Sequence, residues 1–577
     1  MKKTTLIFDI EADGLLDTVS QIWQISTLDV DTLERKSYHD ETLGAGIGYL
    51  KEADALIGHH AIGYDVPLLR KVGGHSLGAS RIVDTLVLSR LGRPVRDGGH
   101  SLAAWGTRLG YEKVVHEDWS QWSPEMENRC AVDVEITYKL WNLLHPMYNI
   151  MPAAIETDHK VATLAAEMIA RGFTLDVKSA RKVLDDKMTA REEMLERFQA
   201  LFPPVLMPTQ SVPKIYKSRN NALNVEPGIP FTPLKVEEFS PTARQQVARR
   251  LAQKYGWKPK VLTATGMPKI DETILRELPY PEAHEFADYL VNDKLISQLD
   301  GDRGWLKHFD REKRVHANFN PTGANTHRSS CSSPNLQQVS KAPEMRTLWK
   351  AMDGMVLVGI DAAGLELRCL AHYLAAYDGG AYADILVNGD IHQHVQDLIG
   401  FSTREKTKNA EYGWLYGAGN AKLGQIARQD ARAGDAYIHK RISNSKLGGA
   451  LRRNMEDGIV GLKELIETVG FRATTGKMKG LDGRPLWVRS EHSALNLLLQ
   501  SAGAILIKTA WSLFDLPRGC HTVMQVHDEW QIECPPWMAD GVGHHVIDCI
   551  KEAGVQLNFK CPVDGSYNIG KNWNETH

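Results

Sequence analysis

Cysteine is scarce in this sequence: there are seven in 577 residues, and no two of them form a C-x-x-C pair. An odd number of scattered cysteines argues against a disulfide framework and against a structural zinc site. The sequence also lacks internal repeats, and no apolar run approaches the ~20 residues that a membrane-spanning helix needs. We therefore expect a protein that works in a reducing cytoplasm and not in a membrane.

A strong excess of charge is also missing, because the formal net charge is −3 and the pI is near 6.8. Duplex binding depends on Lys and Arg that neutralise phosphates, so any nucleic-acid site must be a local basic channel balanced by acidic surface elsewhere. The length exceeds what one hydrophobic core usually supports, which predicts several domains.

The first group of acidic residues begins in the apolar segment 6–12, where Asp9 and Glu11 alternate. Two residues apart on a strand, their side chains point to the same face. Burying both carboxylates without a cation is costly, and oxygen-only ligands favour Mg²⁺ or Mn²⁺. With Asp65 and Asp133, four carboxylates are enough for two-metal hydrolysis of a phosphodiester. Taken singly, each of these acids is better explained as a helix cap or a surface residue.

A second group of acidic residues lies in the C-terminal half. Residues 355–361 form an apolar strand that ends in Asp361, and residues 523–532 form a strand, a tight turn with Asp528 and another strand. A hairpin tip that faces the end of a neighbouring strand brings two carboxylates together. Such a pair is able to hold two magnesium ions for phosphoryl transfer.

Between these two acids, four residues recur at steps of four: Arg404, Lys408, Tyr412 and Tyr416. Steps of four advance about 40° around a helix, so the four side chains form one stripe. Two cations followed by two aromatic rings suit a triphosphate, a sugar and a base. A solvated helix with aromatic residues in the core explains the same stripe without a ligand.

Together these motifs resemble two known families. The acids at 9, 11, 65 and 133 resemble the 3′–5′ exonuclease superfamily with an Asp-Glu-Asp-Asp ligand set. The segments around 361–366, 404–417 and 527–529 resemble motifs A, B and C of family A DNA polymerases, especially short-tailed bacteriophage replicases. The segments 320–338, 388–392, 479–484 and 499–504 extend this second resemblance.

The resemblance implies an α/β multidomain fold, with a ribonuclease H-like exonuclease domain followed by a right-hand polymerase. The expected domains are an exonuclease at 1–150, a thumb with connecting helices at 151–310, palm at 311–392, fingers at 393–498 and the second part of the palm at 499–577. It implies template-directed DNA synthesis with proofreading for a phage genome.

The resemblance also implies roles for single residues in synthesis. Asp361 and Asp528 would bind metal with Glu529 assisting, and Glu366 would exclude a 2′-hydroxyl, partly by bonding to Tyr412. Lys408 would donate a proton to pyrophosphate. Arg404, Lys408 and His392 would contact the triphosphate, and Tyr412 the deoxyribose. Tyr416 would contact the templating base. Arg328, Asn496 and Gln500 would contact the minor groove, and His527 the primer terminus.

Three departures from the family pattern qualify these expectations. Polymerase-associated exonucleases usually carry Tyr four residues before the last Asp, where this chain has Arg129; the histidine variant places its base where this chain has Asn128. Tyr138 or His100 would replace that group only if the fold brings either one near. Relatives usually have Gly where this chain has His327 before Arg328. Relatives that recruit a host processivity protein carry a long thumb insertion, whereas 202–241 is short, which argues against such recruitment.

The expected cofactor is Mg²⁺ or Mn²⁺, two ions in each active site. The expected partners are primer-template DNA, deoxynucleoside triphosphates and other replisome proteins, such as a helicase-primase and a single-strand binding protein, in the cytoplasm of an infected bacterium. Three other functions compete with this interpretation: a scaffold with degenerate sites, a single-subunit RNA polymerase and a stand-alone nuclease. The intact polymerase carboxylates argue against a scaffold. Glu366 and the N-terminal nuclease motifs argue against an RNA polymerase. A stand-alone nuclease would leave the residues beyond the nuclease unexplained.

Overall fold

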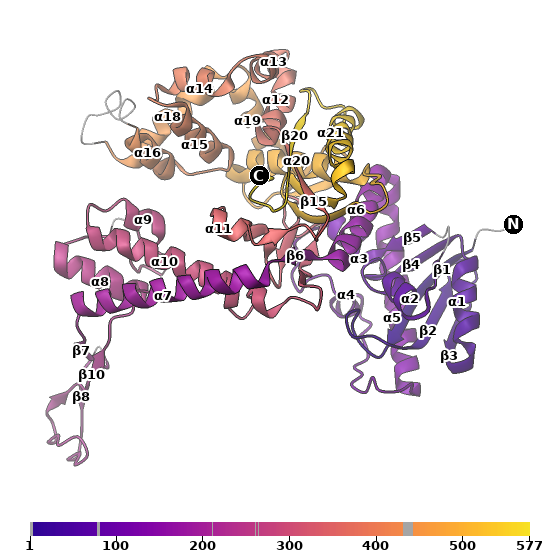
Figure 1. The fold of residues 1–577 in the computed structure, drawn as a ribbon, viewed down its shortest axis with the longest axis horizontal. Helices are drawn as coiled ribbons and strands as arrows, with labels where there is room; N and C mark the ends of the chain where they lie inside the picture. The colour runs from indigo at the N-terminus through magenta and orange to yellow at the C-terminus, as the bar shows by residue number, and fades with distance from the viewer. Residues whose placement is uncertain (1–3, 78–80, 211, 260, 264, 431–441) are drawn as a thin grey trace. The chain divides into compact units, whose positions relative to one another are not determined.

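The computed structural model describes residues 4–77, 81–210, 212–259, 261–263, 265–430 and 442–577 (Figure 1). The chain divides into two compact units. One consists of the chain up to Phe173, His316–Gln338 and Lys350–His577, and the other of Thr174–Val315 and Val339–Trp349. The predicted α/β multidomain class is correct. The domain boundaries stay predictions, and residues 431–441 of the expected fingers lie outside the described part.

The N-terminal region is built on a five-stranded sheet of order β3-β2-β1-β4-β5. β1 pairs antiparallel with β2 and parallel with β4. The strands are β1 (Thr5–Ala12), β2 (Ile22–Asp29), β3 (Arg35–His39), β4 (Ala55–Gly58) and β5 (Arg81–Asp84). The helices are α1 (Leu43–Glu52), α2 (Asp65–Gly73), α3 (Thr85–Gly92), α4 (Leu102–Leu109) and α5 (Pro124–Leu144).

The central strand β1 is buried on both of its faces because each face has its own apolar cluster. Phe8 and Ile10 belong to the cluster that includes α1 and α2 residues. Ile7 belongs to the other cluster, with α5 residues such as Ile136. Asp9 follows two residues after Ile7, so its carboxylate faces the side of the sheet that α5 covers.

The helix α6 (Pro152–Arg171) follows the N-terminal region and contacts both it and the palm. The Nε2 atom of His159 on α6 accepts a hydrogen bond of 2.9 Å from the backbone N–H of Asp84. A second bond joins the Trp487 indole N–H to the Gly92 carbonyl oxygen at 2.8 Å. Both bonds lie inside the first compact unit and tie the nuclease-like sheet to the rest of it.

The two segments predicted to form the palm contribute to an antiparallel sheet of order β18-β19-β15-β20. Its strands are β15 (Val356–Ala362), β18 (His521–Val526), β19 (Glu529–Cys534) and β20 (Gly565–Gly570). The main helices around it are α12 (Leu365–Asp378), α20 (Ala494–Ser512) and α21 (Ala539–Gln556), and α21 packs on β15 and β20. A hairpin of β12 (Asn318–Asn320) and β13 (Ser330–Ser332) belongs to the same unit.

The segment Glu491–Ser512 is the one stretch in the described chain that is long and apolar enough to cross a membrane by length and composition. Of its most apolar window, 78% is buried inside the protein. A core helix of a folded domain passes the same test, so this segment is weak evidence for a membrane span.

The described part of segment 381–473, which spans the end of the predicted first palm part and most of the predicted fingers, is mainly helical. Its helices are α13 (Ala381–Asn388), α14 (Ile391–Ile399), α15 (Arg404–Leu415), α16 (Asn420–Gln429), α18 (Asn444–Gly458) and α19 (Leu462–Ala473). A small hairpin of β16 (Lys477–Lys479) and β17 (Pro485–Trp487) leads from α19 back to α20.

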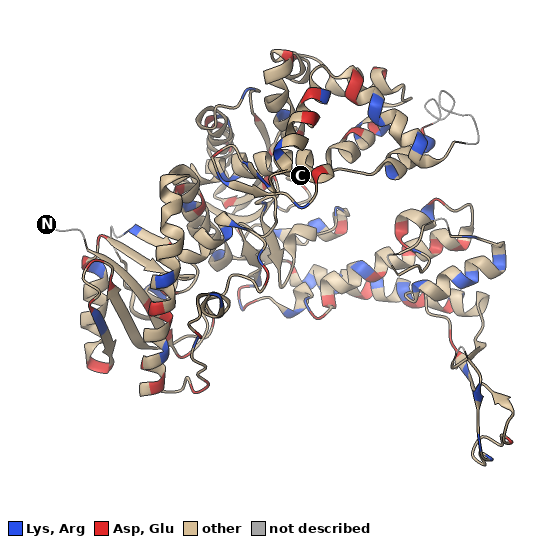
Figure 2. Cartoon of the chain, turned by 180° about the vertical axis from the view of Figure 1, so that it is seen from behind, with Lys and Arg blue, Asp and Glu red and all other residues tan. Residues whose placement is uncertain are grey.

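The second compact unit is mainly helical and packs around a group of phenylalanines, Phe198, Phe202, Phe239 and Phe286. Along α7, Lys and Arg alternate with Asp and Glu (Figure 2). Its helices are α7 (Val177–Leu201), α8 (Arg244–Tyr255), α9 (Glu272–Arg276), α10 (Pro281–Asp300) and α11 (Pro343–Arg346). Its strands are β7 (Val205–Pro208), β8 (Lys214–Ile215), β9 (Pro230–Phe231), β10 (Leu234–Glu237) and β11 (Arg314–Val315); β6 (Phe173–Leu175) and β14 (Trp349–Lys350) lie at its borders.

Candidate active sites

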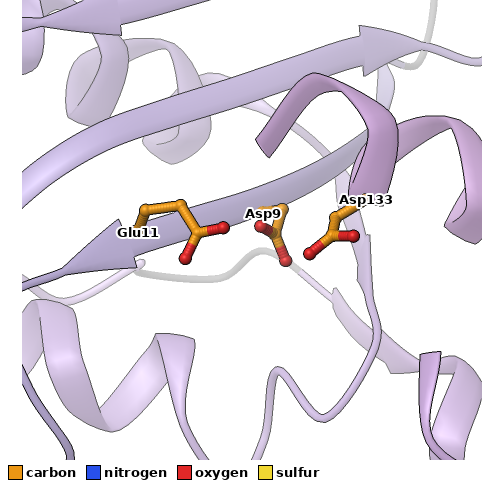
Figure 3. Close-up of side chains that lie close together, drawn as sticks. All are labelled: Asp9, Glu11 and Asp133. Atoms are coloured by element: carbon orange, nitrogen blue, oxygen red, sulfur yellow. The ribbon is translucent and has the colours of Figure 1, made fainter. Parts of the chain in front are cut away.

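Three of the four predicted nuclease acids converge at one place. Oxygen atoms of Asp9, Glu11 and Asp133 all lie within 4.8 Å of one another, with the first two on β1 and the third on α5 (Figure 3). Asp65, the first residue of α2, is buried. It is close enough to raise the pKa of Asp9, but its oxygens are not part of the group within 4.8 Å.

The electrostatics of this cluster call for a cation. Burial raises the pKa of Asp9 well above its usual range, and the neighbouring carboxylates of Asp133, Glu11 and Asp65 raise it further. Burial likewise raises the pKa of Asp65. The buried Oδ1 atom of Asp133 has no hydrogen-bond partner. A group of carboxylate oxygens in which one buried oxygen has no hydrogen-bond partner fits a hard divalent cation.

Two basic side chains already contact the cluster, and sequence reasoning identified only one of them. Arg129 Nε donates to Glu11 Oε1 at 2.8 Å, and its guanidinium lies 4.9 Å from the ring centre of Trp119. Lys113 forms an ion pair with Asp133. Arg129 therefore does more than replace the usual tyrosine, because it neutralises part of the charge that would bind metal.

The two residues considered as substitutes for that tyrosine contact other groups. Nε2 of His100 donates to the Pro94 carbonyl and its Nδ1 accepts from the Ser89 hydroxyl, and burial lowers the pKa of His100 to about 4. Tyr138 packs against the apolar cluster under α5. Tyr64 lies nearer to the acids: burial raises its pKa to about 12, with Asp65 and Glu11 contributing. Its hydroxyl donates to the Gly14 carbonyl at 2.6 Å.

The predicted polymerase carboxylates lie at adjoining strand ends in the palm. Asp361 is near the end of β15, and Asp528 is in the two-residue tip between β18 and β19. The backbone N–H of Ala362 donates to the carbonyl of Asp528 at 3.1 Å, which holds the two strand ends together. Burial raises the pKa of Asp528 to about 7, and the charges of Asp361 and Glu366 add to this rise. A divalent cation between Asp361 and Asp528 would relieve this repulsion, so these residues fit a metal.

Glu529 follows directly after Asp528, but its carboxylate has other partners. Its Oε1 atom accepts from the Trp573 indole at 2.6 Å and from Gln531 at 2.7 Å. Its Oε2 atom lies 2.8 Å from Nδ1 of His577. These hydrogen bonds hold the pKa of Glu529 below its usual value against the opposing effect of burial. The metal-assisting role stays a prediction, and in this structure Glu529 joins β19 to the C-terminal segment.

The stripe of cations and aromatic rings lies on α15, as the spacing predicts. Arg404 donates to Asp390 at 2.9 Å, and Lys408 lies 5.8 Å from the ring centre of Tyr412. The rings of Tyr412 and Tyr416 are stacked, with centres 6.2 Å apart. The side chains of Arg404 and Lys408 are exposed, so both are open to an anionic ligand.

His392, predicted to contact the triphosphate, is buried on α14. Its Nδ1 atom lies 2.6 Å from Oε2 of Glu411 on α15, and the Tyr382 hydroxyl lies 3.4 Å from the other carboxylate oxygen. A carboxylate at Nδ1 fixes the tautomer, so Nε2 is left to face a ligand. Sequence reasoning missed Glu411, because the pairing depends on how α14 packs against α15.

The expected hydrogen bond between Glu366 and Tyr412 is replaced by one with Tyr416. The Tyr416 hydroxyl donates to Glu366 Oε1 at 2.6 Å, and Arg328 lies 3.2 Å from the same oxygen. Tyr416 forms the C-cap of α15, where its ring reaches over Glu366. Within the described part of the chain, no hydrogen bond joins Glu366 to Tyr412.

The remaining predicted DNA contacts lie on α20 and at the hairpin tip. Asn496 and Gln500 are half-buried on α20, and Asn496 donates to the Leu415 carbonyl at 2.8 Å. His527 is exposed at the tip beside Asp528 and has a positive φ of 56°. Their predicted roles on the duplex stay predictions.

A buried charge network that the sequence analysis did not predict lies in the same unit. Arg484 is fully buried and donates to Asp158 at 3.0 Å and to Asp482 at 2.6 Å. Lys508 donates to Asp158 at 3.1 Å and to Thr322 at 2.6 Å. Burial lowers the pKa of Lys508 to about 8, although the charge of Asp158 opposes the shift. The network joins α6, the β16–β17 hairpin and α20.

Comparison with known proteins agrees with this geometry. A family model described as DNA polymerase family A matches residues 230–575. The chain belongs to DNA polymerase family A. It is 30% identical over 711 aligned positions to the DNA-directed DNA polymerases of Enterobacteria phage T3 and Escherichia phage T7, with 99% of this chain and 100% of each relative covered. It is thus of the phage replicase type.

More distant relatives and a solved structure extend this agreement. The chain is 24% identical to the thermostable DNA polymerase I of Thermus aquaticus, over 80% of this chain and 53% of the relative. The solved structure of the POL domain of Pol1 from M. smegmatis, in a complex with DNA primer-template and dNTP, matches with a TM-score of 0.76 and 17% identity. That match covers 100% of this chain and 96% of the other, and it shows that the folds are alike.

Proposed function

We propose that this family A polymerase replicates a phage genome in the cytoplasm of an infected bacterium, and that its N-terminal region proofreads in the 3′–5′ direction. The observation that carries the proposal is the meeting of Asp361 and Asp528 at adjoining strand ends, in the same unit as α15. The substrates would be primer-template DNA and deoxynucleoside triphosphates. Helicase-primase and single-strand binding proteins would be partners in the replisome.

In synthesis, Asp361 and Asp528 would hold two Mg²⁺ ions. When bound, the ions would lower the pKa of the primer 3′-hydroxyl and neutralise charge that develops on the phosphates. Arg404 and Lys408 would bind the triphosphate from α15, and Lys408 would protonate the leaving pyrophosphate. His392, whose Nδ1–H is held by Glu411, would donate from Nε2 to the same phosphates only as the imidazolium, with a proton on each ring nitrogen.

Selection of the nucleotide would depend on Glu366 and the two tyrosines. Glu366 would leave no room for a 2′-hydroxyl, because its carboxylate is fixed by Tyr416 and Arg328. Tyr412 would pack on the deoxyribose, and Tyr416 would occupy the place of the templating base until the fingers move. Arg328, Asn496, Gln500 and His527 would contact the end of the primer duplex.

In proofreading, Asp9, Glu11, Asp65 and Asp133 would hold two divalent ions. Arg129 and Lys113 would have to leave Glu11 and Asp133 before metal binds fully. The loss of a group that positions the attacking water typically costs about 10²- to 10⁴-fold in rate. We therefore propose a proofreading activity that is weak compared with synthesis.

Extension of a 5′-labelled primer with Mg²⁺, with and without nucleotides, tests both sites. Asp361→Ala should abolish extension and leave shortening, whereas Asp9→Ala should abolish shortening and leave extension. Asp457→Ala is a matched control, because Asp457 is exposed and pairs only distantly with Lys463, at 3.9 Å. Extension that survives Asp361→Ala would refute the polymerase site, and shortening that survives Asp9→Ala would refute the nuclease site.

A further inference from the structure

We propose that His327 is a positioning residue for nucleotide selection: it fixes the turn that carries Arg328, and through Arg328 it holds Glu366 and Tyr416 in place. The inference rests on the proposed role of Arg328 at the primer terminus. His327 lies in the loop of the β12–β13 hairpin, in the same compact unit as the palm carboxylates.

The backbone of this loop is tightly closed. The His327 N–H donates to the Ala324 carbonyl at 2.8 Å, and the Arg328 carbonyl accepts from Gly323 at 3.0 Å and from Ala324 at 3.1 Å. His327 itself has a φ of 61°. A residue with a Cβ atom rarely adopts this left-handed conformation, so surrounding contacts must hold it there.

Those contacts come from the imidazole ring, which is fully buried. Its Nε2 atom lies 3.2 Å from the Pro485 carbonyl oxygen, and its Nδ1 atom lies 3.4 Å from an Arg484 guanidinium nitrogen. A carbonyl only accepts and a guanidinium only donates, so one neutral tautomer, protonated on Nε2, satisfies both partners. Arg484 is itself held by Asp158 and Asp482, so the ring is bound to a rigid support.

A second anchor fixes the same loop to the same hairpin. The side-chain amide of Asn325 donates to the Trp487 carbonyl at 2.8 Å. With His327 at Pro485 and Asn325 at Trp487, the loop is held at both ends of β17. Arg328 follows His327 directly, so its direction is set by a backbone that has little freedom.

Two chains of contacts lead from this loop to the reaction site. On one side, Arg328 lies 3.2 Å from Glu366, which accepts from Tyr416 at 2.6 Å. On the other, Ser329 donates to Gln525 at 2.8 Å, and Gln525 donates to the His527 carbonyl at 2.6 Å. Ser329 is also held by the side-chain amide of Gln337 at 2.8 Å, so the tip that carries Asp528 keeps its own support. A shift at His327 would therefore reach Glu366 and Tyr416 through Arg328.

Glycine would satisfy the backbone at this position, because it adopts positive φ at no steric cost. Unlike glycine, the histidine has a buried ring that occupies space beneath the loop and forms two hydrogen bonds. We therefore expect His327→Gly to fold but to leave Arg328 less well positioned. His327→Asn is a second variant, because Asn also tolerates the left-handed conformation while its amide is too short to reach both partners.

The test compares matched and mismatched primer termini in an Asp9→Ala background, so that proofreading does not interfere. The kcat and KM for the next correct nucleotide are measured for the parent, His327→Gly, Arg328→Ala and the double variant. His327→Gly should lower the matched-to-mismatched ratio of kcat/KM about 2- to 10-fold, as expected for one lost hydrogen bond, and mainly through kcat. The double variant should have the same matched-to-mismatched ratio of kcat/KM as Arg328→Ala alone, because His327 acts through Arg328.

The matched control is Lys313→Gly, which relieves a similar φ of 62° at an exposed position and should leave the ratio unchanged. Thermal unfolding checks that each variant is folded, and His327→Asn carries the test if the glycine variant is not. The inference is overturned, without affecting the proposed function, if His327→Gly keeps the parent's matched-to-mismatched ratio of kcat/KM. It is likewise overturned if His327→Gly lowers that ratio further when Arg328→Ala is already present. A normal ratio in Arg328→Ala refutes the role of Arg328, and the inference with it.

Discussion

The buried network around Asp158 makes a strong prediction for stability. The Asp158 side chain is 2% exposed and accepts from Arg484 at 3.0 Å and from Lys508 at 3.1 Å. Asp158→Asn keeps the shape but removes the charge. Arg484 retains Asp482, whereas Lys508 is left buried with no carboxylate bonded to it.

The size of the loss follows from Lys508 and Arg484. Breaking a buried ion pair by removing one partner typically costs about 3–5 kcal/mol. Lys508 limits its own share of this cost by releasing its proton. Because the pKa of Lys508 in the folded parent is already about 8, that release takes only about 0.7 kcal/mol at pH ~7.5, at ~1.36 kcal/mol per unit. The weakened charge-assisted bond to Arg484 adds about 1.5–3 kcal/mol, so we expect Asp158→Asn to lower the free energy of unfolding by about 2–4 kcal/mol.

The pH dependence provides an independent check. In the variant the folded state would hold Lys508 neutral while the unfolded state keeps it protonated, so unfolding takes up a proton and stability rises with pH. In the parent, Lys508 has a pKa of about 8, so this rise begins only above that pH. Between pH ~6.5 and ~8 the variant should gain about 2 kcal/mol relative to the parent.

Urea unfolding of both proteins, with hydrogen exchange of α6 amides as a local readout, measures these differences. Asp457→Asn is the matched control, because its ion pair is exposed and should contribute no more than about 1 kcal/mol. A loss below about 1 kcal/mol in Asp158→Asn, or a pH profile parallel to that of the parent, would refute the argument.

Three further predictions concern the two active sites. Arg129→Tyr should raise Mg²⁺-dependent primer shortening at least about 10²-fold, because it frees Glu11 and restores a group that positions water; an unchanged rate would contradict this. Glu411→Gln should raise the KM for deoxynucleotides more than it lowers kcat in single-nucleotide insertion, because a neutral amide oxygen holds Nδ1–H of His392 more weakly than the carboxylate does; an unchanged KM would count against it. Mg²⁺ affinity without DNA should fall about tenfold per pH unit below 7, because Asp528 must lose a proton with a pKa of about 7, and calorimetry showing no pH dependence would disprove this.

Features that depend on local periodicity could be predicted from the sequence. Asp9 and Glu11 share a face because strand side chains alternate, and the structure brings both near Asp133. Asp528 lies in a hairpin tip because two apolar strands flank a short polar turn.

Features that depend on packing between distant segments could not be predicted. Asp158 and Arg484 are 326 residues apart, and although Arg484 lies in the segment 479–484 that resembles family A polymerases, that resemblance does not identify Asp158 as its partner. Lys113 comes from an irregular segment between α4 and α5, where no period indicates the direction of a side chain. The sequence predicts a hydrogen bond from Tyr412 to Glu366, but the bond comes from Tyr416. Which tyrosine reaches Glu366 depends on how the end of α15 lies relative to α12.

The helix α6 has a consequence for attempts to divide this protein. Its consecutive residues Asp158 and His159 serve different regions: the first completes the charge network of the palm, and the second accepts from Asp84 in the nuclease-like sheet. A truncation that begins at α6 would leave His159 without that partner and would strip the Trp487 indole of its bond to Gly92. The polymerase region is therefore a poor modular unit, and a shortened enzyme would need new residues on that side of α6 before it behaved as an independent domain.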